Sequence, residues 1–165
     1  MASSSWEWKP YTKTIHRSVY PAIDPTNPAN SAAGKVVLVT GGGSGLGKHI
    51  AIAFNKAGAK AIIITGRREN VLREAATELQ KSGDAKVLFF KADVTDEVAL
   101  KNAFASAAEE VGPVDVVVAN AGYMATPEPA ASADVADWWK AYGSFSSSLA
   151  LPYSSSPSKS GSDAN

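Results

Sequence analysis

The sequence predicts an α/β fold built on a doubly wound parallel sheet. Short apolar runs of strand length alternate along the chain with amphipathic stretches that are long enough to form helices. A glycine-rich turn joins the first apolar run to the first amphipathic stretch, which is the layout of a strand–turn–helix unit that holds a phosphate group. This alternation favours parallel strands, because each crossover needs a helix to return the chain to the same edge of the sheet.

The composition is that of a globular and electrically balanced domain. The 165 residues suggest a single domain, and 45% of them are hydrophobic. Sixteen basic and sixteen acidic residues give a formal net charge of zero, so we expect neither a nucleic-acid partner nor binding to a membrane. The chain has no cysteine, which excludes disulfides and thiolate metal ligands, and no metal site is expected. The N-terminus lacks the apolar core of a secretory signal, so we expect a cytoplasmic protein.

Residues 1–33 are expected to form an arm outside the folded domain. Four prolines interrupt this segment and favour extended or turn geometry over a helix. The arm is unusually aromatic for a solvated linker, since it contains Trp6, Trp8, Tyr11 and Tyr20. We favour a disordered arm and leave open whether these side chains dock on the domain or on a second subunit.

The dinucleotide-binding domain is expected to span residues 34–142 and to begin with the strand–turn–helix unit. A strand at 36–40 runs into the glycine-rich loop, and a helix follows at about 45–57. Glycine permits positive φ angles and a close approach of the backbone to a ligand. The helix N-terminus presents free N–H groups and the positive end of its dipole, so an anion is expected there. The candidate binding residues are Gly41, Gly43, Ser44, Gly45, Leu46 and Gly47.

The following segments repeat the strand–helix pattern. Strands are expected at 61–65, 87–91 and 114–119, and helices at 69–81 and 96–111. The resulting strand order is 3-2-1-4, as in a partial Rossmann sheet. A ligand crevice is expected at the carboxyl ends of the first and fourth strands.

The pattern weakens after the fourth strand. One more helix is expected at 131–142, with Trp138 and Trp139 among its apolar residues. Residues 143–165 are rich in serine and carry too little apolar surface to offset the entropy of ordering the chain. We therefore expect a disordered tail in this segment.

The end of the second strand indicates which cofactor is bound. A carboxylate at this point accepts hydrogen bonds from a ribose 2′-hydroxyl and repels a 2′-phosphate. This chain has Thr65 and Gly66 there, followed by Arg67 and Arg68. A guanidinium group can hold a phosphate through two charge-assisted hydrogen bonds. The arginines could also be solvated residues that open the next helix, but we favour NADP(H) over NAD as the cofactor.

Motifs at the ends of successive strands resemble those of the short-chain dehydrogenase/reductase family. The glycine loop has the spacing T-G-x-x-x-G-x-G from Thr40 to Gly47, similar to the cofactor loop of that family. The pair after the third strand resembles its adenine-contacting pair, although an Asp there also suits an ordinary turn. The triplet after the fourth strand resembles its N-A-G motif, which implies that the Asn helps to fix the central strand and that the small pair after it leaves room for the nicotinamide ribose. These residues are Asp93 and Val94, then Asn120, Ala121 and Gly122.

The resemblance implies an oxidoreductase that transfers hydride between the cofactor and a carbonyl or alcohol. The family uses a Tyr as acid/base, a Lys four residues later, and a Ser that orients the substrate. None of the five tyrosines of this chain is followed by lysine at that spacing. We therefore expect a C-terminally truncated member without the catalytic residues, which would meet a small-molecule substrate only if completed.

Three interpretations remain open at this point. The chain is an incomplete family enzyme, a non-catalytic dinucleotide-binding module, or a non-functional product of an altered reading frame. The change at residue 143 from α/β patterning to a serine tract favours a truncated or misread chain. We also expect self-association, because the fourth strand would be an apolar edge and Trp138 and Trp139 would be exposed.

Overall fold

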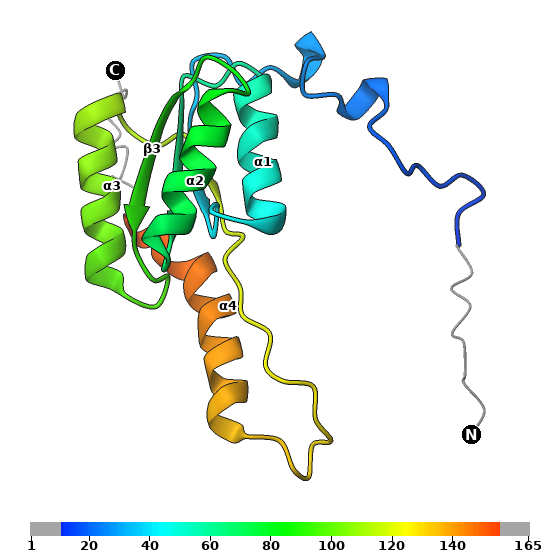
Figure 1. Ribbon diagram of the computed structural model, residues 1–165, viewed down its shortest axis with the longest axis vertical. Helices are drawn as coiled ribbons and strands as arrows, with labels where there is room; N and C mark the ends of the chain where they lie inside the picture. The colour runs from blue at the N-terminus through cyan, green and yellow to red at the C-terminus, as the bar shows by residue number, and fades with distance from the viewer. Residues whose placement is uncertain (1–10, 156–165) are drawn as a thin grey trace, which may run out of the picture.

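Alternating strands and helices form the body of the molecule, as the sequence predicts. The computed structural model describes residues 11–155, with the backbone alone for 148–155. Three of the helices lie between successive strands, and the fourth follows the last strand (Figure 1). The elements are β1 Val36–Thr40, α1 Gly45–Lys56, β2 Ala61–Gly66, α2 Glu69–Gln80, β3 Lys86–Lys91, α3 Glu97–Val111, β4 Val116–Val118 and α4 Val135–Ser155.

The four strands form one parallel sheet in the order β3-β2-β1-β4, which confirms the predicted topology. The central strand β1 pairs with β2 through Leu38 opposite Ile63, and with β4 through Leu38 opposite Val117. Strands β2 and β3 are added on one side of β1, whereas β4 is added on the other side. The carboxyl ends of β1 and β4 therefore flank the crevice that forms where the strand order reverses.

Alternate side chains of β1 enter two separate cores. Val37 and Val39 pack with residues of α1 and α2 on one face of the sheet. Val36 and Leu38 pack with α3 on the other face (Figure 1). All four are at most 2% exposed. The continuous apolar sequence of this strand therefore reflects burial on both faces, as is typical of a parallel sheet covered by helices.

The fourth strand is shorter than the 114–119 expected from the sequence. Asp115 interrupts it at the start: its amide donates to the carbonyl of Val36 at 2.9 Å, and its carboxylate accepts from the amide of Val36 at 2.9 Å. At the other end the amide of Asn120 turns back to the carbonyl of Val118 at 2.9 Å. The Asp115 carboxylate at one end and the turn at Asn120 at the other thus limit the strand to three residues.

The described part of the N-terminal arm is largely exposed but contains local structure. Two 3-10 turns, Pro21–Ile23 and Pro28–Asn30, are tied together by the Asn30 side chain, whose amide donates to the carbonyls of Ala22 and Asp24. The arm meets the domain at Ala32, which is 6% exposed and donates its amide to the carbonyl of Ala57. Trp6 and Trp8 lie outside the described residues.

The last helix differs from the 131–142 expected for it. Asp134 caps its N-terminus, because its carboxylate accepts from the amide of Ala136 at 2.8 Å. The helix then continues through Gly143 to Ser155, so residues 143–155 are helical where a disordered tail was expected. The hydroxyls of Ser144 and Ser146 donate to carbonyls one turn earlier, which satisfies these groups within the helix. Residues 156–165 of that expected tail lie outside the described residues.

Helix α4 extends away from the carboxyl-end edge of the sheet (Figure 1). Three of its aromatic side chains lie together with about half of their surface exposed: Trp138, Trp139 and Tyr142. No helix within residues 11–155 is both long enough and apolar enough to cross a bilayer.

A buried amide joins three elements of the domain. Asn55 in α1 is 2% exposed, and its side-chain nitrogen donates to the carbonyl of Leu79 in α2 at 2.7 Å. Its side-chain oxygen accepts from the amide of Ala85, next to β3, at 3.0 Å. Removal of either partner would leave a buried polar group without its hydrogen bond, which costs about 1–3 kcal/mol.

We therefore expect Asn55→Ala to lower the free energy of unfolding by about 2–3 kcal/mol, because it leaves the amide of Ala85 unpaired. The measurement is urea unfolding followed by circular dichroism. Asn102→Ala is the matched control, since Asn102 is an exposed residue of α3 and alanine favours a helix. Equal destabilisation by the two variants would contradict this role of Asn55.

Candidate functional site

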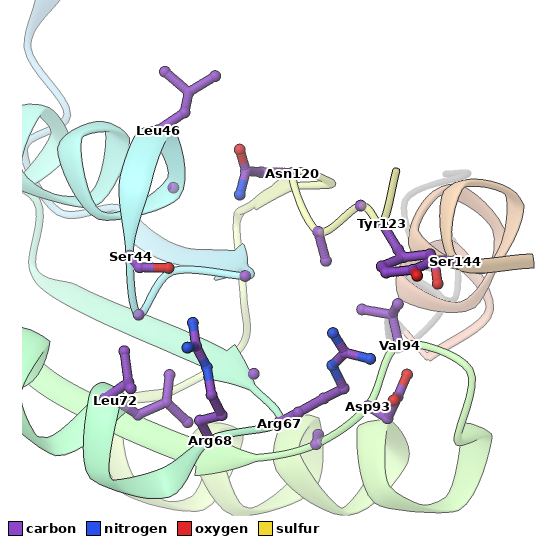
Figure 2. Close-up of a pocket in the computed structure, with 18 residues that line it drawn as sticks. Ser44, Leu46, Arg67, Arg68, Leu72, Asp93, Val94, Asn120, Tyr123 and Ser144 are labelled. Atoms are coloured by element: carbon purple, nitrogen blue, oxygen red, sulfur yellow. The ribbon is translucent and has the colours of Figure 1, made fainter. Parts of the chain in front are cut away.

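A cavity of about 280 Å³ opens at the carboxyl ends of the strands. It lies between the β1–α1 loop, the start of α2, the β3 exit and the β4 exit (Figure 2). Every candidate site residue from the sequence lines it except Gly45. The lining residues are Gly41, Gly43, Ser44, Leu46, Gly47, Gly66, Arg67, Arg68, Val71, Leu72, Ala92, Asp93, Val94, Asn120, Ala121, Gly122, Tyr123 and Ser144.

Two glycines of the loop allow the start of α1 to approach the β4 exit. Gly41 has a φ of +67°, and a Cβ atom on it would lie 3.0 Å from the Cα of Ala121. A Cβ atom on Gly47 would lie 2.4 Å from the carbonyl oxygen of Gly41 and 2.5 Å from the side-chain nitrogen of Asn120. Larger residues at these two positions would force the loop and the β4 exit apart.

A small hydrogen-bond network fixes the β4 exit against β1. The side-chain amide of Asn120 donates to the carbonyl of Thr40 at 2.9 Å. The hydroxyl of Thr40 accepts from the amides of Asn120 and Ala121 at 3.1 and 3.0 Å. Asn120 was expected to help fix the central strand, whereas no such role was expected for Thr40. The feature of the sequence that could have indicated a role for Thr40 is that this polar residue ends an otherwise apolar strand.

The N-terminus of α1 faces the cavity with its capping hydroxyl uncommitted. Ser44 is the N-cap residue, yet its side chain makes no capping hydrogen bond within the described structure. Ser44 lies on the same side of the cavity as Arg68, whereas Arg67 lies toward the other end (Figure 2). A helix N-terminus with free N–H groups favours an anion such as a phosphate.

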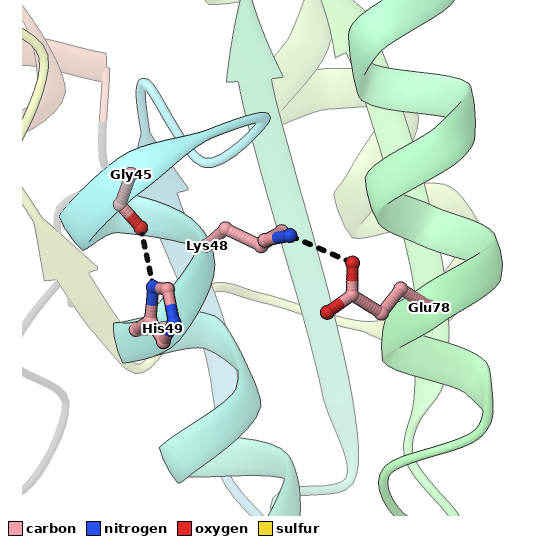
Figure 3. A network of polar contacts seen from close by, with 4 residues as sticks. All are labelled: Gly45, Lys48, His49 and Glu78. Carbon is pink, nitrogen blue, oxygen red and sulfur yellow. Dashed lines mark hydrogen bonds and ion pairs between the residues drawn. The ribbon is translucent and has the colours of Figure 1, made fainter.

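The charged residues that follow in α1 are engaged elsewhere. Lys48 donates to the carboxylate of Glu78 in α2 at 2.7 Å, and this bond lowers the pKa of Glu78 (Figure 3). His49 is an exposed surface residue, and its Nδ1 lies 2.8 Å from the carbonyl oxygen of Gly45. Lys48 therefore ties α1 to α2 and does not line the cavity.

Arg67 and Arg68 supply the positive charge of the cavity. Arg68 points toward Ser44 and the glycine loop, whereas Arg67 points toward the end that contains Asp93 and Val94 (Figure 2). Both side chains are exposed, and among the described residues neither forms an ion pair. By contrast, Arg73 one turn later is paired with Glu69 at 3.0 Å.

Asp93 and Val94 occupy one end of the cavity. The carboxylate of Asp93 accepts from the amide and the hydroxyl of Thr95 at 3.0 and 2.9 Å, which is an Asx turn. Val94 is 7% exposed and packs with Ala92 and Leu100. The turn thus presents one acidic and one apolar side chain at a fixed position beside the cavity.

Six residues that line the cavity are not among the site residues expected from the sequence: Gly66, Val71, Leu72, Ala92, Tyr123 and Ser144. Tyr123 and Ser144 carry the polar side chains of this set. Tyr123 donates its hydroxyl to the carboxylate of Asp137 in α4 at 2.7 Å. This bond raises the pKa of Tyr123, which the charge of Arg67 partly opposes, and it lowers the pKa of Asp137. Ser144 reaches the cavity from α4, in the segment expected to be a tail. Only the position of α4 could have revealed Ser144, whereas Tyr123 directly follows the expected site residues Asn120, Ala121 and Gly122 in the sequence.

The family model described as short chain dehydrogenase matches residues 35–147. Short chain dehydrogenase pigC of Monascus ruber is 37% identical over 137 residues, covering 80% of this chain and 44% of that protein. The chain thus spans less than half of this relative.

Solved structures show the same relationship. A 3-ketoacyl-(acyl-carrier-protein) reductase from Brucella melitensis, complexed with NADH, has a TM-score of 0.68 and 33% identity over 75% of this chain and 49% of that one. L-Sorbose reductase from Gluconobacter frateurii, complexed with NADPH and L-sorbose, has a TM-score of 0.63 and 29% identity over 76% of this chain and 45% of that one. This chain therefore belongs to the short-chain dehydrogenase/reductase family.

Proposed function

We propose that the chain binds NADP(H) in this cavity, as the cofactor-binding part of a short-chain dehydrogenase/reductase. The observation that carries the proposal is the placement of Arg67 and Arg68 opposite the glycine loop and the N-terminus of α1. Positive side chains and free helix N–H groups thus face the same space. A dinucleotide with a 2′-phosphate is an anion that suits both.

The shape of the cavity supports the fit of a dinucleotide. The pyrophosphate belongs at the N-terminus of α1, where the close approach at Gly41 and Gly47 leaves the backbone accessible. The adenine belongs at the end with Asp93 and Val94, and the nicotinamide ribose beside the turn after Asn120. When bound, the cofactor supplies the hydride chemistry of the family.

The preference for NADP(H) depends on the two arginines. The two solved relatives contain NADH in one case and NADPH in the other. In this chain no carboxylate follows β2, and Gly66 leads directly into Arg67 and Arg68. Either guanidinium can hold a 2′-phosphate with two hydrogen bonds.

For catalysis we propose that this chain alone is inactive. Reduction of a carbonyl needs a proton donor beside the hydride donor. The Y-x-x-x-K pattern that supplies it in the family does not occur in these 165 residues. The chain then serves as the binding part of a longer enzyme or as a non-catalytic module; a non-functional product is the remaining alternative.

We also propose that copies of the chain associate. In the described sheet β4 is an edge strand, and its outer N–H and C=O groups have no partner strand. Trp138, Trp139 and Tyr142 add an exposed aromatic surface on α4. Burial of these groups against a second copy would remove both from water.

The cofactor proposal predicts tighter binding of NADPH than of NADH in a calorimetric titration at low salt. Arg67→Asp and Arg68→Asp should each weaken NADPH binding about 10-fold or more, because each replaces a charge-assisted bond by a repulsion. The affinity for NADH should change much less. Arg73→Asp is the matched control, since it makes the same charge change outside the cavity. Equal affinities for the two cofactors in the unaltered chain would refute the preference.

The catalytic proposal predicts no NADPH consumption above background with a panel of ketones and aldehydes. A complete family reductase serves as the positive control in the same assay. Clear turnover that is lost in Tyr142→Phe or Tyr153→Phe would show that a tyrosine of this chain acts as the proton donor.

The association proposal predicts a concentration-dependent mass in sedimentation velocity. The double variant Trp138→Lys, Trp139→Lys should shift the distribution toward monomer, because two charges cannot be buried without partners. Val98→Lys is the control, since Val98 is 68% exposed and belongs to another helix, α3. A monomer at all concentrations for the unaltered chain would rule the proposal out.

A further inference from the structure

One wall of the cavity is formed by α4 and by the segment between β4 and α4. Ser144 of α4 is 9% exposed and lines the cavity, as does Tyr123 just after the β4 exit. Both lie above Val94, at the same end as Asp93 (Figure 2). This wall is therefore at the end assigned to the adenine, opposite the side formed by Ser44 and Arg68.

Tyr123 is held in place by contacts to α4. Its hydroxyl donates to one carboxylate oxygen of Asp137 at 2.7 Å, and the amide of Thr126 donates to the other at 2.9 Å. The ammonium group of Lys140 lies 5.1 Å from the centre of the tyrosine ring. Asp137 thus joins the segment after β4 to the first turn of α4, and the ring cannot swing away without breaking a charge-assisted bond.

Tyr123 is also the only aromatic residue that lines this cavity in the part of the chain that the structure describes. Its hydroxyl is committed to Asp137, so the part of the side chain left for a ligand is the ring. A flat heteroaromatic base gains from contact with an aromatic side chain through apolar burial and dispersion.

We propose that Tyr123 contacts the adenine of the bound dinucleotide, and that Asp137 is the positioning residue that holds it there. The inference depends on the proposed function, because it assigns a wall of the same cofactor cavity. It also gives α4 a role: the helix closes the adenine end of the site.

The test measures the affinity of NADPH by calorimetry for the full chain and its variants. Tyr123→Ala removes the ring and should weaken binding about 5- to 20-fold. Tyr123→Phe keeps the ring but loses the bond to Asp137, so a loss of about 2- to 4-fold is expected. Met124→Ala is the matched control: Met124 is the next residue, is 84% exposed and does not line the cavity.

Asp137 is tested by a double-mutant cycle. Asp137→Asn should weaken NADPH binding about as much as Tyr123→Phe does, and should add nothing in the Tyr123→Phe background. A merely structural role would instead give additive losses in the two backgrounds. Asparagine keeps one oxygen for the amide of Thr126, which limits the change to the tyrosine bond.

Fragments of the cofactor locate the contact. The loss in Tyr123→Ala should appear with 2′,5′-ADP, which contains the adenine, and not with nicotinamide mononucleotide. An unchanged NADPH affinity in Tyr123→Ala would overturn this inference and leave the proposed function intact. Failure of the unaltered chain to bind NADPH would overturn both. If the melting temperature of Tyr123→Ala falls, Tyr123→Leu, which keeps apolar bulk without the ring, gives the decisive affinity.

Discussion

The site depends on the contact between the ends of β1 and β4. Thr40 accepts two hydrogen bonds from Asn120 and one from the amide of Ala121 across this junction, at 2.9 to 3.1 Å. These bonds satisfy polar groups that the sheet ladder leaves unpaired when β4 ends after three residues. They also set the distance between the glycine loop and the β4 exit. A Cβ atom on Gly47 would already lie within 2.5 Å of the Asn120 side chain, so the two segments cannot move closer.

The charge of the cavity depends on which nearby cations form ion pairs. It does not follow from the net charge of the chain, which is zero. Lys48 and Arg73 lie close to the cavity along the chain, but each is bound to a glutamate of α2. Arg67 and Arg68 form no such pair within the described structure. The two arginines therefore bring unpaired positive charge to the cavity, where the N-terminus of α1 is also positive. A balanced composition can in this way contain a strongly cationic site.

Most of the sheet and the glycine loop could be predicted from the sequence, because their signals are local. A strand buried on both faces is an unbroken apolar run, and β1 and β2 show it directly. The limits of β4 could not be predicted, since they depend on bonds between Asp115 and Val36, 79 residues apart.

The length of α4 was also missed. A serine-rich composition reads as disorder, whereas Ser144 and Ser146 satisfy their hydroxyls inside the helix. Ser144 enters the cavity only through the placement of that helix, which no local pattern encodes. The domain limits and the role of each cofactor residue remain predictions.

The position of β4 has a consequence for how the chain folds. Strands β1, β2 and β3 are neighbours both along the chain and in the sheet, so each pair is joined by a connection with a single helix. Strand β4 must instead return to β1 across the whole β2–β3 region, which closes a much longer loop before any pairing is gained. We expect the three-stranded part to form first and β4 to add last. On that pathway the crevice between β1 and β4 forms only when β4 pairs with β1, after the other three strands have paired.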